Sequence, residues 1–114
     1  MATRTLSMPK KPTPIDPQRL RGGAVEAVAA LKLLGNVDRL LLLCQLSHGE
    51  MCVSDLEEQL QIHQPTLSQQ LGVLRGEGVV DTRRQGKNIF YSVSDPALLE
   101  ILALLYRLYC NEEL

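Results

Sequence analysis

The sequence predicts a mainly α-helical domain that carries one small β-hairpin. Five segments, four before residue 77 and one after residue 94, show helical signals, either apolar residues spaced for one helical face or capping residues. Between them, residues 79–93 alternate apolar and polar side chains, as strands do, and Gly86-Lys87 stands where a tight turn is expected. The chain has 114 residues, of which 45% are hydrophobic, so one domain with its own core is expected.

The N-terminal segment 1–17 is expected to be a disordered or extended arm, because it contains four prolines and few apolar residues. Its basic residues are not followed by an apolar stretch, so we do not expect a signal peptide. No segment approaches the roughly 18 apolar residues of a membrane span. We therefore expect a cytoplasmic protein with no membrane partner, whose folded domain covers residues 18–111.

The first two predicted helices cover about residues 18–34 and 37–47. Gly35 ends the first helix, and Asn36 is a suitable N-cap for the second. The second helix carries apolar residues on most of its surface, so it is expected to lie at the centre of the domain.

The third and fourth predicted helices form a helix-turn-helix. The third begins at a capping box formed by Ser54 and Glu57 and ends near Leu60. Residues 61–64 make a tight turn, and the fourth helix covers residues 65–76.

The fourth helix has one apolar stripe and a small, uncharged polar surface. Pro65 suits the first helical position. The stripe consists of Leu67, Leu71 and Leu74, and the other faces hold Thr66, Ser68, Gln69, Gln70 and Val73. These polar groups both donate and accept hydrogen bonds, which suits DNA base edges and phosphates. This pattern, taken alone, fits an ordinary amphipathic helix equally well. The neighbouring elements are therefore needed to choose between the two interpretations.

The hairpin and the last helix favour a DNA-reading role for the fourth helix over an ordinary amphipathic helix. The predicted strands, 79–85 and 88–93, enclose a basic tip that includes Arg84 and Lys87. The last helix, about residues 96–109, has Asp95 as its cap and is apolar on almost every side. Such a helix usually forms a subunit interface, although coverage by the first helix of the same chain is the alternative.

A helix-turn-helix followed by a basic hairpin is a winged helix-turn-helix, which binds double-stranded DNA. The fourth helix would enter the major groove through Thr66, Ser68 and Gln69, while Arg84 and Lys87 would reach phosphates or the adjacent minor groove. A two-fold homodimer would place two such helices about 34–36 Å apart and would bind a palindromic operator. The net charge of −1 argues weakly against this, but basic residues concentrate in segments 1–21 and 75–87.

The chain resembles the ArsR/SmtB-type bacterial repressors from about Ala24 to Cys110. The resemblance is strongest in Leu-Ser-Gln-Gln-Leu at 67–71, Glu-Gly-Val-Val at 77–80 and Gly-Lys-Asn-Ile-Phe-Tyr-Ser-Val at 86–93. It implies a dimer built from four helices, two strands and a last helix, with the first and last helices at the interface. It also implies that Gln64, Ser68 and Gln69 meet DNA, and that an inducer releases the repressor.

Both metal sites known in this family are incomplete in this chain. One family site uses Cys-Val-Cys-Asp-Leu, whereas residues 52–56 are Cys-Val-Ser-Asp-Leu, so the second thiol is missing. The other uses histidines on the last helix, which has none; His48 and His63 are expected in turns at the surface. We therefore expect no metal and no cofactor.

The remaining candidates for sensing are Cys44 in the second helix and Cys110 at the end of the last. This pair resembles the sulfide- and persulfide-sensing branch of the family, of the BigR and SqrR kind, as does the run at 64–75. The resemblance implies that oxidation or reactive sulfur bridges Cys44 and Cys110 and switches off operator binding. A buried core residue is the alternative for Cys44, and Cys52 is expected to be a bystander.

Two other functions stay open at this point. The inducer could be a thiophilic metal or arsenite held by some of the three cysteines. In another class, the chain could be a protein-interaction module with a purely structural hairpin. An enzyme is not expected, because we find no paired carboxylates beside a histidine, no nucleophile with a base, and no glycine-rich phosphate loop.

Overall fold

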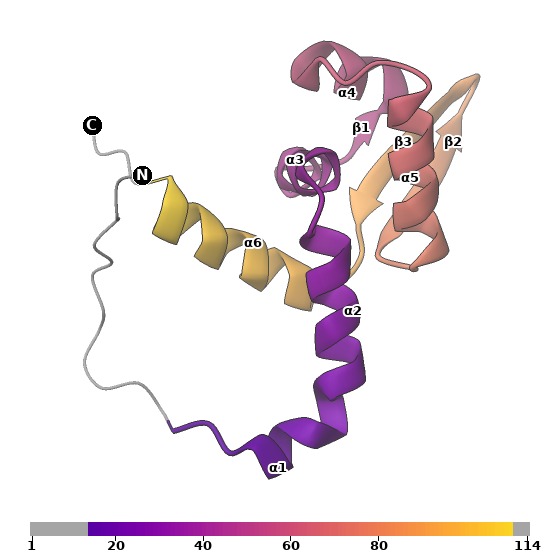
Figure 1. Cartoon of the computed structure of the whole chain (residues 1–114). Coiled ribbons are helices and arrows are strands. Elements are labelled where there is room, and N and C mark those ends of the chain that lie inside the picture. Colours follow the sequence, from indigo (N-terminus) through magenta and orange to yellow (C-terminus); the bar gives the residue numbers. More distant parts are fainter. Residues whose placement is uncertain (1–13, 111–114) are drawn as a thin grey trace.

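The computed structural model describes residues 14–110, and it has the predicted helical architecture with a small sheet (Figure 1). The elements in chain order are α1 (Pro17–Leu20), the 3₁₀ helix η1 (Arg21–Gly23), α2 (Ala24–Leu34), α3 (Val37–Leu46), β1 (Met51–Cys52), α4 (Val53–Leu60), α5 (Thr66–Gly76), β2 (Val80–Gln85), β3 (Asn88–Val93) and α6 (Pro96–Tyr109). Residues 1–13 of the predicted arm lie outside the described residues. Within the rest of that arm, Asp16 caps α1 and Pro17 begins it.

The core is built from leucines that converge on α3. Among the largest side chains, Leu42, Leu43, Leu56 and Leu67 are completely buried. Helix α3 packs against α2, α4, α5 and β3, which confirms the central position expected from its apolar surface. Burial of several leucines in one cluster supplies the main driving force for folding such a domain.

The hairpin is one part of a three-stranded antiparallel sheet with the order β1-β3-β2. The predicted pairing of β2 with β3 is present, and Gly86-Lys87 is the turn between them. The short strand β1 was not expected; Met51 pairs with Tyr91 and Cys52 with Phe90. Two residues are too few to show an alternating pattern, so only tertiary pairing identifies this strand.

Three local predictions are wrong. The first helix is divided into α1, η1 and α2, and Gly22 and Gly23 lie at the division. Glycine weakens a helix interior because it has more backbone freedom to lose. Helix α4 begins at Val53, and its N-cap residue makes no side-chain capping bond, so the capping box of Ser54 and Glu57 is absent. Helix α5 begins at Thr66, one residue later than expected.

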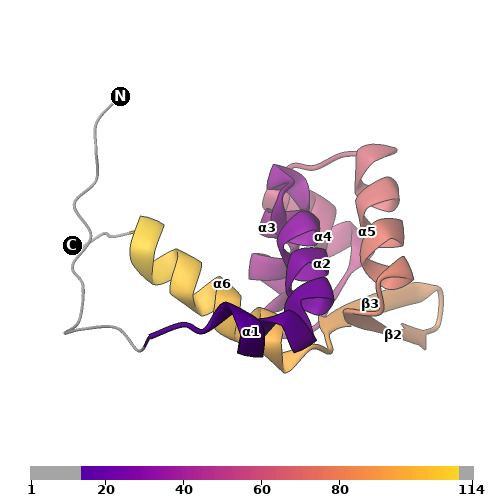
Figure 2. The ribbon, with the colours of Figure 1, turned by 60° about the horizontal axis from the view of Figure 1, so that its bottom comes forward.

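Helices α1, α2 and α6 extend beyond the body formed by α3, α4, α5 and the sheet (Figures 1 and 2). They carry large apolar side chains that this chain does not cover, including Val25 at 80% exposure and Leu31 at 64%. Helix α6 buries Leu98 and Leu102 on one side only. The last helix is therefore not covered by the N-terminal helices of the same chain. Within the described residues, no helix is long and apolar enough to cross a membrane.

Candidate functional site

Helix α5 presents its polar side to solvent because its leucines are buried against the domain. Leu67, Leu71 and Leu74 are buried, and the helix packs on α3 and β2. Ser68 and Gln69 are exposed as a result. The predicted separation of an apolar stripe from an uncharged polar surface is therefore present in the structure.

Gln64 both precedes α5 and stabilises its first turn. Its amide oxygen accepts hydrogen bonds from the Ser68 backbone nitrogen (3.1 Å) and from the Ser68 Oγ (2.6 Å). The first backbone N–H groups of a helix have no partner within the helix, so this contact satisfies one of them. The sequence did not show this capping role. Within the described part of the chain, the Gln64 Nε2 group keeps its hydrogens for another acceptor. Thr66 lies beside this contact and is half-buried.

The two arginines of strand β2 have different environments because strand residues alternate between faces. Arg83 pairs with Glu50 through both carboxylate oxygens, donates to Gln85 (2.8 Å), and lies 4.6 Å from the centre of the Phe90 ring. Its guanidinium is held against the outer face of the sheet. The contact also keeps the pKa of the Glu50 carboxyl below its usual value.

Arg84 lies on the opposite face of the wing from Arg83. It shares that face with Val80 and Tyr91, both of which are buried against the helices. Near the end of the hairpin this face extends past the body, so Arg84 is exposed, as is Lys87 in the turn. Neither residue forms an ion pair within residues 14–110. Arg84 is therefore available on the same side of the sheet as α5, and Lys87 is available at the tip of the hairpin.

The two candidate sensing thiols, Cys44 and Cys110, lie on different helices and differ in exposure. Cys44 lies near the end of α3 and is half-buried, whereas Cys110 ends α6 and is exposed. Burial raises the pKa of the Cys44 thiol, and the neighbouring charge of Cys110 raises that pKa further. These two thiols come from segments 66 positions apart in the sequence, and both are free. Cys52 is buried in β1 with its Sγ 3.4 Å from the Ser54 Oγ.

The described residues contain no cluster of three or more histidine, cysteine or acidic side chains that could hold a metal ion. His63 lies 3.3 Å from the Glu57 carboxylate, between α4 and the turn before α5. His48 follows α3 and is exposed. The two histidines and the three cysteines therefore do not converge on one metal site in this part of the chain.

Comparisons with known proteins agree with this geometry. Residues 36–82 match the family model described as "Bacterial regulatory protein, arsR family". The biofilm growth-associated repressor of Agrobacterium fabrum is 48% identical over 90 residues, which cover 79% of this chain and 77% of that protein.

Two solved structures are similar over most of the chain. The transcriptional repressor BigR of Xylella fastidiosa has a TM-score of 0.82 and 42% identity, and the match covers 86% of this chain and 100% of that one. Reduced HlyU of Vibrio cholerae has a TM-score of 0.76 and 37% identity, with 82% and 99% covered. The winged helix-turn-helix predicted from sequence is therefore confirmed. This chain belongs to the arsR family of bacterial regulatory proteins, a family of transcriptional regulators and not of enzymes.

Proposed function

We propose that this protein is a dimeric, cytoplasmic transcriptional repressor that leaves its operator when Cys44 and Cys110 become bridged by reactive sulfur. The single observation that carries the proposal is the placement of these two thiols. One belongs to the central helix α3 and the other to the end of α6, and the charge of Cys110 raises the pKa of the Cys44 thiol. The similarity to repressors of the BigR kind supports the repressor role.

In this proposal α5 enters the major groove of a palindromic operator. Ser68 and Gln69 face the base edges, with Gln64 and Thr66 at the start of the helix beside the DNA backbone. All four carry donors or acceptors of the kind that base edges and phosphates require. Arg84 and Lys87 bind phosphates or the adjacent minor groove. The exposure of Arg84 on the α5 side of the sheet, and of Lys87 at the tip of the hairpin, supports this role.

A second copy of the chain covers the apolar faces of α2 and α6. Leu31 on α2 is 64% exposed, and Leu104 and Tyr106 on α6 are 42% and 63% exposed. Exposed apolar side chains on neighbouring turns of a helix are costly in water and mark association surfaces. A two-fold arrangement would bury both faces and set the separation of the two reading helices at about one turn of DNA.

The exposed Cys110 is the attacking thiol, and the half-buried Cys44 is the resolving thiol. The Cys110 thiolate attacks the outer sulfur of an organic persulfide, RSSH. That sulfur is transferred to Cys110, which becomes a persulfide, and the rest of the molecule leaves as the thiol RSH. Cys44 then attacks the Sγ of Cys110 and expels hydrogen sulfide. The two protein thiols are oxidised by two electrons as the transferred sulfur is reduced to sulfide. Access favours this order, since reactivity requires an exposed thiolate.

The bridge would act on DNA binding through the helices it connects. A covalent link between α3 and α6 would tie the support of α5 to the proposed dimer interface. The tilt of α3 against α6 would change, and the separation of the two α5 helices would change with it. Rigidly packed interfaces respond to such shifts by moving between discrete arrangements.

The alternative inducer, a thiophilic metal or arsenite, has less support. Such a ligand commonly requires three thiolates, and Cys52 is buried in the sheet beside Ser54. No observation favours the third function, a protein-interaction module, over DNA binding. Family membership and the free cationic groups of the wing both favour DNA.

The wing prediction concerns salt dependence. Arg84→Ala should reduce the slope of log Kd against log salt concentration by about one, because one phosphate contact is lost. Fluorescence anisotropy with a labelled operator duplex measures the slope. The matched control is the charge-neutral double variant Glu50→Gln/Arg83→Gln, whose slope should stay unchanged. An equal reduction of the salt slope in both variants would contradict the assignment of Arg84, and not Arg83, to the face of the hairpin that binds DNA.

The thiol prediction concerns alkylation at different pH values. Cys110 should react with iodoacetamide before Cys44 at neutral pH. In Cys110→Ser the pKa of Cys44 should fall, because the neighbouring charge is gone, yet stay above the ordinary thiol value, because the burial remains. Mass spectrometry of the Cys44 peptide across pH gives the titration curve, and Cys52→Ser is the control. An identical curve in Cys110→Ser and the unmodified protein would rule out the contact.

The sensing prediction concerns release from DNA. Glutathione persulfide should weaken operator binding of the unmodified protein at least about tenfold, which corresponds to about 1.4 kcal/mol. Intact-mass measurement should show Cys44 linked to Cys110 and count the bridging sulfurs, and dithiothreitol should restore binding. Cys44→Ser and Cys110→Ser should not respond, whereas Cys52→Ser should respond normally. A response that survives in either of the first two variants would disprove the bridge.

The dimer prediction concerns the apolar faces. Leu31→Glu and Leu104→Glu should each shift the protein toward monomer, because a buried carboxylate at the interface is strongly unfavourable. Gln59→Glu on α4 is the control, since Gln59 is exposed and lies on neither α2 nor α6. Sedimentation equilibrium distinguishes the species. A monomeric unmodified protein, or variants that all stay dimeric, would contradict the proposed interface.

A further inference from the structure

Arg39 connects two helices, α2 and α5, that face each other across a groove. It lies in the first turn of α3, where its backbone nitrogen donates to the Asn36 side-chain oxygen at 3.0 Å. Its side chain is half-buried and leaves α3 toward α2 and α5. The capped helix end fixes the starting point of this long side chain.

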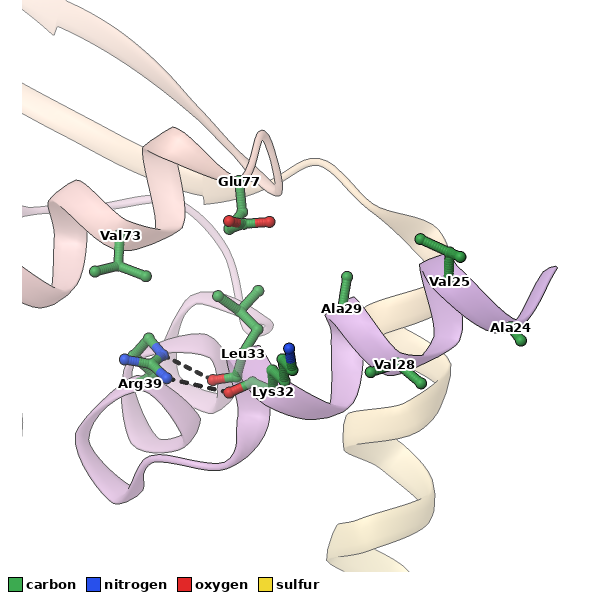
Figure 3. A pocket seen from close by; sticks show the side chains of 9 residues that line it. All are labelled: Ala24, Val25, Val28, Ala29, Lys32, Leu33, Arg39, Val73 and Glu77. Atoms are coloured by element: carbon green, nitrogen blue, oxygen red, sulfur yellow. Dashed lines mark hydrogen bonds between the residues drawn. The ribbon is translucent and has the colours of Figure 1, made fainter.

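One edge of the Arg39 guanidinium caps the C-terminal end of α2. Nε donates to the Leu33 carbonyl at 2.8 Å and Nη2 donates to the Lys32 carbonyl at 3.1 Å (Figure 3). The last carbonyls of a helix lack intrahelical donors and carry a partial negative charge, so a cation is favoured there. This two-pronged contact requires the planar fork of arginine, which lysine does not have.

The remaining arm of the guanidinium reaches the helix proposed to read DNA. Nη1 donates to the Gln70 amide oxygen at 3.0 Å. Gln70 is half-buried, whereas its neighbour Gln69 is exposed. The contact therefore holds the turn of α5 that carries the two residues proposed to meet base edges, Ser68 and Gln69.

The space around this contact is open. Helix α2 packs mainly on η1 and α3, and a groove of about 620 Å³ separates it from α5. Figure 3 shows Val73 and Glu77 on one side of the groove and Ala29 and Val28 on the other. Because side-chain packing does not fill this space, the Arg39 fork is the polar link between the two helices among the described residues.

We propose that Arg39 is a positioning residue for operator recognition, which sets the orientation of α5 against the end of α2 through Gln70. The proposal rests on α5 being the reading helix, but it requires neither the dimer nor the thiol bridge. A helix turned about its axis still approaches phosphates, whereas its base contacts lose their alignment. The Arg39 contact should therefore control the preference for operator over unrelated DNA more than the overall affinity for DNA.

The test compares affinities for two duplexes. One is selected from random DNA by the unmodified full-length protein, and the other is a scrambled sequence of the same composition. Gln70→Ala removes the α5 contact and leaves the cap on α2 intact. Arg39→Lys keeps the charge and removes the fork. Gln59→Ala, at an exposed glutamine of α4, is the matched control.

Gln70→Ala and Arg39→Lys should each reduce the ratio of selected to scrambled affinity about tenfold. In both variants the affinity for scrambled DNA and its salt slope should stay unchanged. In Gln59→Ala the ratio of selected to scrambled affinity should also stay unchanged. Because both substitutions break the same contact, the double variant should lose no more than either single variant. Gln70→Glu, which keeps the acceptor, should retain the ratio.

Two results would overturn the proposal. If the ratio is unchanged in Gln70→Ala, Arg39 only caps α2 and does not position α5. This conclusion holds whether or not the melting temperature of the variant changes. Additive losses in the double variant would mean that the two residues act separately. Gln69→Ala distinguishes the failure of the underlying assumption. If it too leaves the ratio unchanged, α5 is not the reading helix; if it lowers the ratio while Gln70→Ala does not, only the role of Arg39 is wrong.

Discussion

Helix α3 is buried on several sides, and the positions of the other elements follow from this packing. Leu42, Leu43 and Leu46 occupy the core, and α2, α4, α5 and β3 all contact this helix. Apolar side chains cover much of α3, and its Arg39 and Cys44 are both half-buried. Arg39 at one end and Cys44 near the other both have proposed roles.

The two ends of α3 therefore offer two different connections. Arg39 links the end of α2 to α5 by hydrogen bonds, which require matched geometry but form no covalent bond. At Cys44, the charge of Cys110 on α6 raises the pKa of the thiol. In the proposed repressor, a change in the tilt of α3 against α6 would reach α5 through the shared core and through the Arg39 fork. Coupling of this kind needs a packed element with two arrangements, and a central helix is suited to that role.

The wing shows how strand geometry separates two adjacent cations of similar chemistry. Arg83 and Arg84 differ by one position, so they lie on opposite faces of β2. Arg83 is occupied by Glu50, Gln85 and the Phe90 ring, and it stiffens the hairpin against the loop before β1. Arg84 stays exposed on the side of α5. The sequence analysis selected Arg84 and Lys87, but only the pairing register explains why Arg83 differs.

The sequence by itself determined the order of the helices and the hairpin, the leucine stripe of α5 and the apolar excess of α6. These are periodic patterns, and each depends on residues close together in the chain. The tertiary structure decided the two-residue strand β1, the break at Gly22 and Gly23 and the loss of the expected capping box. It also decided the contacts between distant segments, including Arg39 with Gln70 and Glu50 with Arg83. Periodicity shows which side of an element is buried, but which side chains meet across the core depends on how the elements pack.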